Sequence, residues 1–96
     1  MAIISDIQIS TNKYYEDQSG TALTTSFAKQ EFGFASFSIF IANDQSSSGY
    51  VEYSFDGTNV HGRLNATEKR SMDFRRQREI WLRGESGGES YRLEVY

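Results

Sequence analysis

The 96-residue sequence contains no cysteine, no proline and a single histidine, His61. The absence of cysteine excludes a disulfide scaffold, a cysteine nucleophile and a cysteine-type zinc site, and one histidine excludes a two-histidine metal site. We therefore expect no metal and no cofactor. Because no run of 18 apolar residues is present, we expect no transmembrane helix. Residues 1–6 lack the basic and apolar regions of a signal peptide, so none is expected.

What is present is the composition of a folded domain, with 38% apolar, 15% aromatic and 24% charged residues. A chain of this length predicts one domain over residues 1–96. The dominant hydrophobic period is two, which is typical of strands with one buried face. The alternating segments are residues 7–9, 23–27, 35–41, 51–55, 80–82 and 93–95. The sequence therefore predicts an all-β fold, a single antiparallel β-sandwich of about seven or eight strands, jelly-roll or immunoglobulin-like in strand order.

The connections are also visible in the sequence. Asp56-Gly57 between alternating apolar residues predicts a tight hairpin, because Gly readily adopts the positive φ that such a turn needs. Residues 44–49 and 84–90 are polar and predict loops. Residues 65–79 are ambiguous, since residues 65–68 are able to cap a turn of helix. We interpret this stretch as a loop that leads to a strand near residues 71–74.

A catalytic function is not supported by the residues. His61 follows Val60, so alternation places it outward, as a hydrogen-bonded turn residue rather than a general base. No Gly-x-Ser-x-Gly segment marks a serine nucleophile. The carboxylate pairs Glu16/Asp17 and Glu52/Asp56 match no calcium loop and are better interpreted as solvated turns. We therefore expect that the protein is not an enzyme.

Charge is unevenly distributed along the chain, which has a net charge of −3. Residues 1–60 have two basic and seven acidic groups, a net of −5, and residues 61–96 have eight basic and six acidic groups, a net of +2. The cations concentrate in residues 69–83 and are mostly arginines, which suit carboxylate or phosphate partners. The negative net charge opposes nucleic-acid binding. A protein contact and a merely solvated loop remain the alternatives for this stretch, and neither involves a membrane.

Several aromatic residues, including Phe34 and Phe40, are out of phase with their apolar neighbours and are expected to face outward or into a partner, unless a curved sheet buries both of its faces. Trp81, between Ile80 and Leu82, is expected to point outward beside Arg83. An exposed Trp with Arg is the composition of an interface anchor, and the same rings would also stack on a sugar. We interpret eight residues as a candidate protein interface: Tyr50, Arg70, Arg75, Arg76, Arg78, Trp81, Arg83 and Tyr96.

Three segments of the second half of the chain form a recognisable pattern: Tyr-Val-Glu-Tyr-Ser-Phe-Asp-Gly-Thr-Asn-Val-His-Gly at residues 50–62, Met-Asp-Phe-Arg-Arg at 72–76 and Ile-Trp-Leu-Arg-Gly at 80–84. This pattern resembles one in small structural proteins of tailed bacteriophages. It implies a virion component that is made in the host cytoplasm, most plausibly a capsid decoration (cement) protein. Such a protein binds the major capsid protein lattice, or another virion protein, as a homo-oligomer, with a trimer favoured, and stabilises the head. It implies no catalytic residues.

Two other functions fit the same residues. A carbohydrate-binding, lectin-like β-sandwich of a phage fibre or tail would stack sugars on Tyr50, Trp81 and Tyr96. A head–tail or tail adaptor would need the same small β domain with adhesive edges. The sequence also leaves open whether residues 2–10 pair within their own sheet or with a neighbouring chain.

Overall fold

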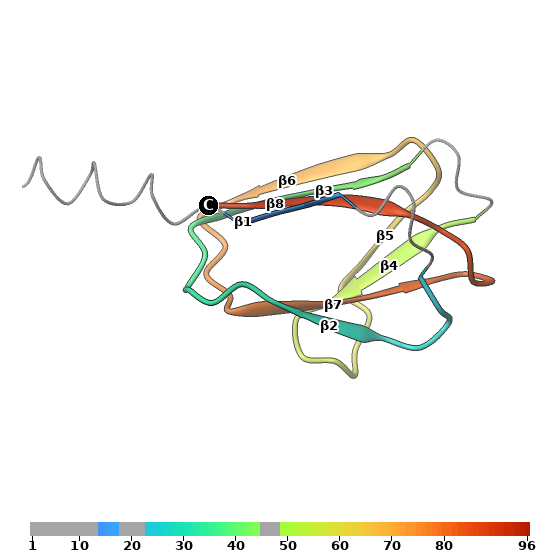
Figure 1. Ribbon diagram of the computed structural model, residues 1–96, viewed down its shortest axis with the longest axis horizontal. Helices are drawn as coiled ribbons and strands as arrows, with labels where there is room; N and C mark the ends of the chain where they lie inside the picture. Colours follow the sequence, from blue (N-terminus) through green and yellow to red (C-terminus); the bar gives the residue numbers. More distant parts are fainter. Residues whose placement is uncertain (1–13, 18–22, 45–48) are drawn as a thin grey trace, which may run out of the picture.

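The computed structural model describes residues 14–17, 23–44 and 49–96, and this part of the chain contains eight strands and no helix (Figure 1). The strands are β1 (Tyr14–Asp17), β2 (Ala28–Glu31), β3 (Ser38–Asn43), β4 (Val51–Ser54), β5 (Gly62–Leu64), β6 (Lys69–Asp73), β7 (Glu79–Gly84) and β8 (Tyr91–Val95).

The strands form two four-stranded antiparallel sheets, which Figure 1 shows as two layers. Sheet A has the order β1-β8-β3-β6 and sheet B the order β2-β7-β4-β5. Among the described strands, β4 and β5 are the one consecutive pair that are neighbours in the same sheet; every other connection passes from one sheet to the other. This is the strand order of a jelly roll rather than an immunoglobulin-like sandwich. The predicted all-β antiparallel sandwich of seven or eight strands is confirmed.

The core lies between the sheets and follows the period-two alternation of the long strands. In β3, Ile39 and Ile41 are fully buried, and in β7 Ile80 and Leu82 occupy the equivalent positions. The other buried hydrophobic residues are Leu23, Phe32, Val51, Tyr53, Leu64, Tyr91, Leu93 and Val95. Because both faces of a strand cannot enter this layer, the alternate residues of β3 and β7 face outward, where a functional surface is available.

Two predicted strands begin later than their alternation indicates. Residues 23–27 precede β2 and are not a strand; the Leu23 N–H donates to the Glu89 carbonyl (2.8 Å) and the Thr24 hydroxyl to the Ser26 carbonyl (3.1 Å). In the segment predicted from residue 35, β3 starts at Ser38. Ser36 is buried and Phe37 exposed, although alternation puts Phe37 in phase with the buried Ile39 and Ile41, because the chain turns before it joins sheet A.

The hairpin predicted at Asp56-Gly57 is present, because β4 and β5 pair antiparallel, but the prediction of a tight turn is wrong. The β4–β5 connection spans residues 55–61, although Gly57 does have a positive φ of 82°. The Asp56 carboxylate accepts hydrogen bonds from the N–H groups of Asn59 and Thr58 (both 2.8 Å), so the loop is wider and is organised around this side chain. These hydrogen bonds, that from Asn59 above all, hold the pKa of Asp56 well below its usual range.

Residues 65–68 form a turn and not a turn of helix. The Asn65 N–H donates to Glu68 Oε1 (2.6 Å) and the Glu68 N–H to the Asn65 carbonyl (2.9 Å), so the predicted capping contact forms without a helix after it. Strand β6 then begins at Lys69, close to the strand predicted near residues 71–74. The strand predicted at residues 7–9 lies outside the described residues, and β1 has no counterpart in the prediction.

Candidate protein-interaction surface

The structure distributes the eight predicted interface residues over three places. Trp81 and Arg83 lie on the outer face of sheet B, with Tyr50 just before β4 beside them. Arg70 lies on β6 and reaches between the sheets, where its Nη1 donates to the Tyr53 hydroxyl (2.9 Å). The remaining four, Arg75, Arg76, Arg78 and Tyr96, gather at one end of the sandwich.

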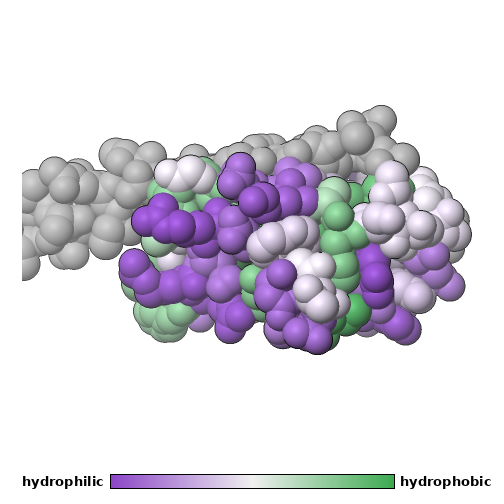
Figure 2. Space-filling model, turned by 90° about the horizontal axis from the view of Figure 1, so that it is seen from below, coloured by the Kyte–Doolittle hydropathy of each residue, from purple (hydrophilic) through white to green (hydrophobic). Residues whose placement is uncertain are grey.

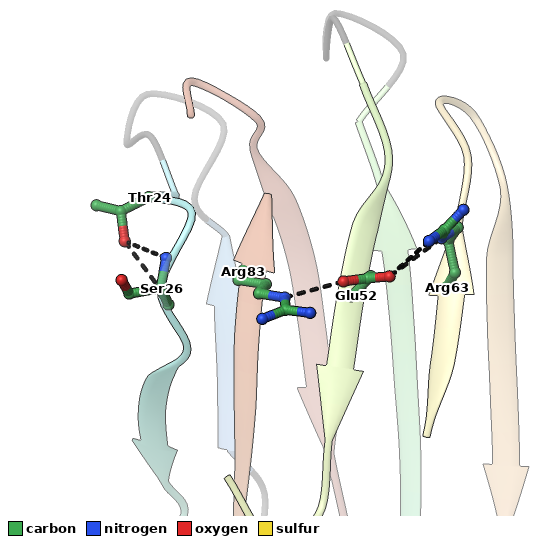
Figure 3. Close-up of polar contacts among 5 residues, drawn as sticks. All are labelled: Thr24, Ser26, Glu52, Arg63 and Arg83. Atoms are coloured by element: carbon green, nitrogen blue, oxygen red, sulfur yellow. Dashed lines mark hydrogen bonds and ion pairs between the residues drawn. The ribbon is translucent and has the colours of Figure 1, made fainter. Parts of the chain in front are cut away.

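The outer face of sheet B is organised around Glu52. Register places Glu52 of β4 between Arg63 of β5 and Arg83 of β7, and Figure 3 shows its carboxylate between the two guanidinium groups. Arg63 Nη2 donates to Oε2 (2.8 Å) and Arg83 Nε to Oε1 (2.9 Å). The Glu52 side chain is 7% exposed. Both arginines therefore form ion pairs with a carboxylate of the same chain.

Burial of this carboxylate and its ion pairs act in opposite directions on its pKa. Burial raises the pKa of Glu52, but the hydrogen bonds from Arg63 and Arg83 outweigh it and hold the pKa below its ordinary value. In turn, the hydrogen bond to Glu52 raises the pKa of Arg63. The triad is thus charged at neutral pH and stabilises sheet B.

Aromatic rings extend this arrangement on both sides. The Arg63 guanidinium carbon lies 3.8 Å from the centre of the Tyr50 ring, and that of Arg83 lies 4.3 Å from the Phe27 ring. Trp81 is half-buried, and its ring packs so closely against Gly57 that a Cβ added there would lie only 2.9 Å from it. On sheet B, therefore, the arginines form their ion pairs and stacking contacts with other residues of the same chain.

The other cluster, which we call the end surface, comprises Phe37, Phe74, Arg75, Arg76, Arg78 and Tyr96. Its arginine loop, residues 74–78, connects β6 to β7 and is held by the fully buried Ser36. The Ser36 N–H donates to the Gln77 carbonyl (2.7 Å), the Gln77 N–H donates to Ser36 Oγ (2.8 Å), and the Ser36 hydroxyl donates to the Arg75 carbonyl. The loop is therefore fixed at its centre.

The end surface also exposes aromatic rings. Phe74 is 74% exposed and has a φ of 62°, in the left-handed region that a bulky side chain rarely adopts. Its ring packs edge-to-face on Phe37, with centroids 5.1 Å apart. Tyr96 lies next to this pair, because its carbonyl accepts the Phe37 N–H (2.6 Å). The Tyr96 hydroxyl donates to Glu94 (2.6 Å), which raises the Tyr96 pKa.

Sequence reasoning found the arginines and Tyr96 of the end surface but missed Ser36, Phe37 and Phe74. Alternation placed Phe37 inside, and Phe74 looked like the last residue of a strand. The exposure of Phe37 and Phe74 depends on the turn before β3 and on the positive φ of Phe74, and no local sequence pattern predicts either feature. Phe34, predicted to face outward, instead packs against the core.

The arginines of the end surface border a hollow of about 420 Å³, lined by Ala35, Phe55, Arg76, Gln77, Arg78 and Glu79. The Arg75 guanidinium stacks on Phe55, 3.8 Å from the ring centre. Among the described residues, no carboxylate lies within 4.0 Å of the three guanidinium groups. Figure 2 shows hydrophobic patches beside strongly hydrophilic side chains at this end, on the left. The end surface thus offers apolar area and cationic groups together.

The structure also places the residues that were considered for catalysis and metal binding, namely His61 and the acidic side chains. His61 Nδ1 accepts the Phe55 N–H (3.0 Å), as expected of a hydrogen-bonded turn residue. Within residues 14–17, 23–44 and 49–96, no group of three or more His, Asp or Glu side chains is placed to hold a metal ion. The same part of the chain has no helix long and apolar enough to cross a membrane.

Comparison with known proteins identifies no relative by sequence: no protein-family model and no curated protein matches the chain. Solved structures do share its fold. FeII HppE aligns with a TM-score of 0.51 at 13% identity, over 88% of this chain and 50% of that one, so this chain spans half the length of that protein.

Two further structures align less closely. The C-terminal CBM6 of LamC, a laminarinase from Zobellia galactanivorans, aligns with a TM-score of 0.49 at 12% identity, over 88% of this chain and 89% of that one. The Tobacco streak virus coat protein aligns with a TM-score of 0.39 at 11% identity, over 88% and 85%. At these identities the likeness concerns the fold alone, and a jelly roll of this kind is compatible with a non-enzymatic binding or structural protein.

Proposed function

We propose that this chain is a non-enzymatic structural protein of a tailed-phage virion, a capsid decoration protein that binds the major capsid protein through its end surface. The single observation that supports this most is Phe74, a large apolar side chain that is 74% exposed and held outward by a positive φ. Backbone strain at an exposed residue is typical of functional sites, and exposed aromatic area gains free energy when a partner buries it.

The chemistry of the end surface supports a protein partner. Aromatic residues and arginine dominate the energetically important parts of protein interfaces. Here Phe37 and Phe74 supply the apolar area, and Arg76 and Arg78 supply donors for a partner's acceptors. Because Ser36 already fixes the arginine loop, little conformational entropy is lost when a partner binds.

The small size of the chain fits a protein that works in an assembly. A 96-residue domain gains little net stability from its own core, and binding to a lattice adds stability by mass action. A homo-oligomer, with a trimer favoured, would place several end surfaces on the capsid at once, and the gain in avidity would offset a weak single contact.

The test uses virions of the phage that encodes the protein, analysed by mass spectrometry and by cryo-electron microscopy of the heads. We expect many copies on the outer surface of the head, with Phe74 at the contact. Phe74→Ala should abolish rebinding to stripped heads. Val60→Ala, which truncates another exposed apolar side chain, should leave rebinding intact. Absence from virions, or presence only in tails, would contradict the proposal.

A further inference from the structure

We infer that the end surface recognises an acidic polypeptide segment that also carries an apolar side chain. This inference rests on the proposed function in one respect only, namely that the end surface is a protein contact, and it specifies the chemistry of the partner. Two features of the surface lead to it: arginines that have no carboxylate within 4.0 Å in the described part of the chain, and a pair of exposed phenylalanine rings beside them.

The arginines account for the preference for acidic residues in the partner. Arg76 and Arg78 are two residues apart and line the same hollow, so their side chains leave the chain on one side. Of the two carboxylates nearest in sequence, Asp73 Oδ1 lies 3.5 Å from the Ser38 hydroxyl, and Glu79, which also lines the hollow, lies 3.8 Å from Lys29 Nζ. A guanidinium group without an internal partner matches a carboxylate by two parallel hydrogen bonds.

The third arginine of the loop adds a buried donor. Arg75 is half-buried against Phe55, and its Nε has no hydrogen-bond partner within the described part of the chain. Stacking on the ring fixes the plane of the guanidinium group, so its other nitrogen atoms have a defined direction. Arg75 therefore adds positive potential next to the hollow at a small further cost in side-chain entropy.

The two phenylalanines account for the preference for an apolar side chain in the partner. Phe37 and Phe74 meet edge-to-face and leave 42% and 74% of their surfaces exposed. Since they lie in the β2–β3 and β6–β7 connections, the rings border the arginine loop directly. A partner side chain such as Leu or Phe would pack against them while a carboxylate one or two residues away meets the arginines.

Nucleic acid is the less favoured occupant of the same surface. Aromatic rings and arginines also bind single-stranded nucleic acid, but that binding needs an extended positive groove along the backbone. Here Asp73 and Glu79 flank the arginine loop on both sides, and the chain as a whole has a net charge of −3. Repulsion by these charges is stronger for a polyphosphate, which carries a charge on every nucleotide, than for a short peptide with a few carboxylates.

The experiment titrates the isotope-labelled protein with two synthetic peptides and follows backbone and side-chain NMR signals. The first peptide is acetyl-Gly-Ser-Glu-Leu-Asp-Phe-Glu-Gly-Ser-amide, and in the second lysine replaces each acidic residue. We expect the acidic peptide to shift the signals of Phe37, Phe74, Arg76 and Arg78, with an affinity about tenfold above that of the lysine peptide at low salt. This difference should decrease as salt is added.

Variants separate the charge from a general loss of structure. Arg76→Gln with Arg78→Gln should reduce the affinity for the acidic peptide about tenfold. The matched control, Lys69→Gln with Arg92→Gln, removes the same charge from the outer face of sheet A and should leave the affinity unchanged. Unchanged amide signals in the cores of both sheets establish that each variant is folded.

Several results would overturn the inference. They are equal binding of both peptides, shifts that lie outside the end surface, and tighter binding of an oligo-thymidine strand than of the acidic peptide. Concentration-dependent shifts at the same residues without peptide would assign the surface to a second copy of the chain instead. None of these results bears on the presence of the protein in virions, so failure of the inference can be distinguished from failure of the proposed function.

Discussion

The outer face of sheet B and the end surface use the same residue types in opposite ways. On sheet B, Arg63 and Arg83 share the carboxylate of Glu52 and stack on Tyr50 and Phe27. At the end surface, Arg76 and Arg78 have no carboxylate within 4.0 Å among the described residues, and Phe74 is the most exposed large hydrophobic side chain there. The arginines of sheet B thus have carboxylate partners within the chain, and Arg76 and Arg78 have none among the described residues.

This difference shows that an interface cannot be identified from composition alone. Arginine and aromatic residues gather in both places, but on sheet B their interactions contribute to the free energy of folding. At the end surface Arg76 and Arg78 form no ion pair within the described residues, so their interaction free energy remains for a partner. Substitutions on sheet B should therefore change stability, and substitutions at the end surface should change binding.

The largest effect is expected for Glu52→Gln. The change removes the negative charge between two arginines and leaves a buried amide in its place, so we expect the free energy of unfolding to fall by about 2–3 kcal/mol. Urea unfolding at pH 7 measures it. Glu31→Gln, at an exposed ion pair with Lys29 on the same sheet, should cost about 0.5 kcal/mol or less. Similar losses for both variants would contradict the central role of Glu52.

The same carboxylate predicts a pH dependence. Because the pKa of Glu52 is lower in the folded protein than its ordinary value of 4.5, its contribution is fully present above that value and is lost as the pH falls through the folded-state pKa. Thermal unfolding of wild type and Glu52→Gln between pH 7 and pH 3 should show a difference in Tm that shrinks with acidification. A constant difference would mean that folding does not lower the pKa of Glu52.

A smaller loss of stability is expected for Ser36→Ala. This change leaves the Arg75 carbonyl and the Gln77 N–H without their hydrogen bonds in a half-buried place, at a cost of about 1–2 kcal/mol. It should also loosen the arginine loop and weaken binding of the acidic peptide. Ser38→Ala, whose hydroxyl makes only a 3.5 Å contact with Asp73, should change the free energy of unfolding by less than about 0.5 kcal/mol. If the peptide affinity of Ser36→Ala were unchanged, the loop would not need this support.

The smallest change in stability, and of opposite sign, is expected for Phe74→Gly. Glycine adopts a φ of 62° without strain, which offsets the loss of the ring contact with Phe37, so we expect a gain of about 0.5 kcal/mol. The variant should nevertheless fail to bind stripped heads. A clear loss of stability would show that Phe74 contributes to folding, and the contrast between the two clusters would then disappear.

Much of the fold could be predicted, because the long strands bury one face against a single core. The alternation in β3, β7 and β8 therefore appears directly in the sequence. Residues 23–27 alternate in the same way without forming a strand. The Thr24 hydroxyl hydrogen-bonds to the backbone of Ser26, and the backbone groups of Leu23 and Thr24 bond to residues 84, 88 and 89. The positive φ of Gly57 was predictable as well, but the length of its loop depended on the hydrogen bonds of Asp56.

The candidate site was predicted only in part. Arginine-rich residues 74–78 stand out in any reading of the sequence, and Tyr96 accompanies them at the end surface. Trp81 and Arg83 are equally conspicuous, but Glu52 lies 31 residues from Arg83 in the sequence and pairs with it only through the β4–β7 register. Whether an arginine has an internal partner is thus decided by strand order.

By itself, the sequence determined the class of fold, the absence of cysteine chemistry and the position of the arginine-rich segment, since composition and period-two alternation are local properties. Only the tertiary structure decided the jelly-roll order, the pairing of Glu52 with two arginines and the exposure of Phe74. The physical reason is that these features depend on contacts between segments far apart in the chain, and 3.6- or 2-residue periods carry no information about them.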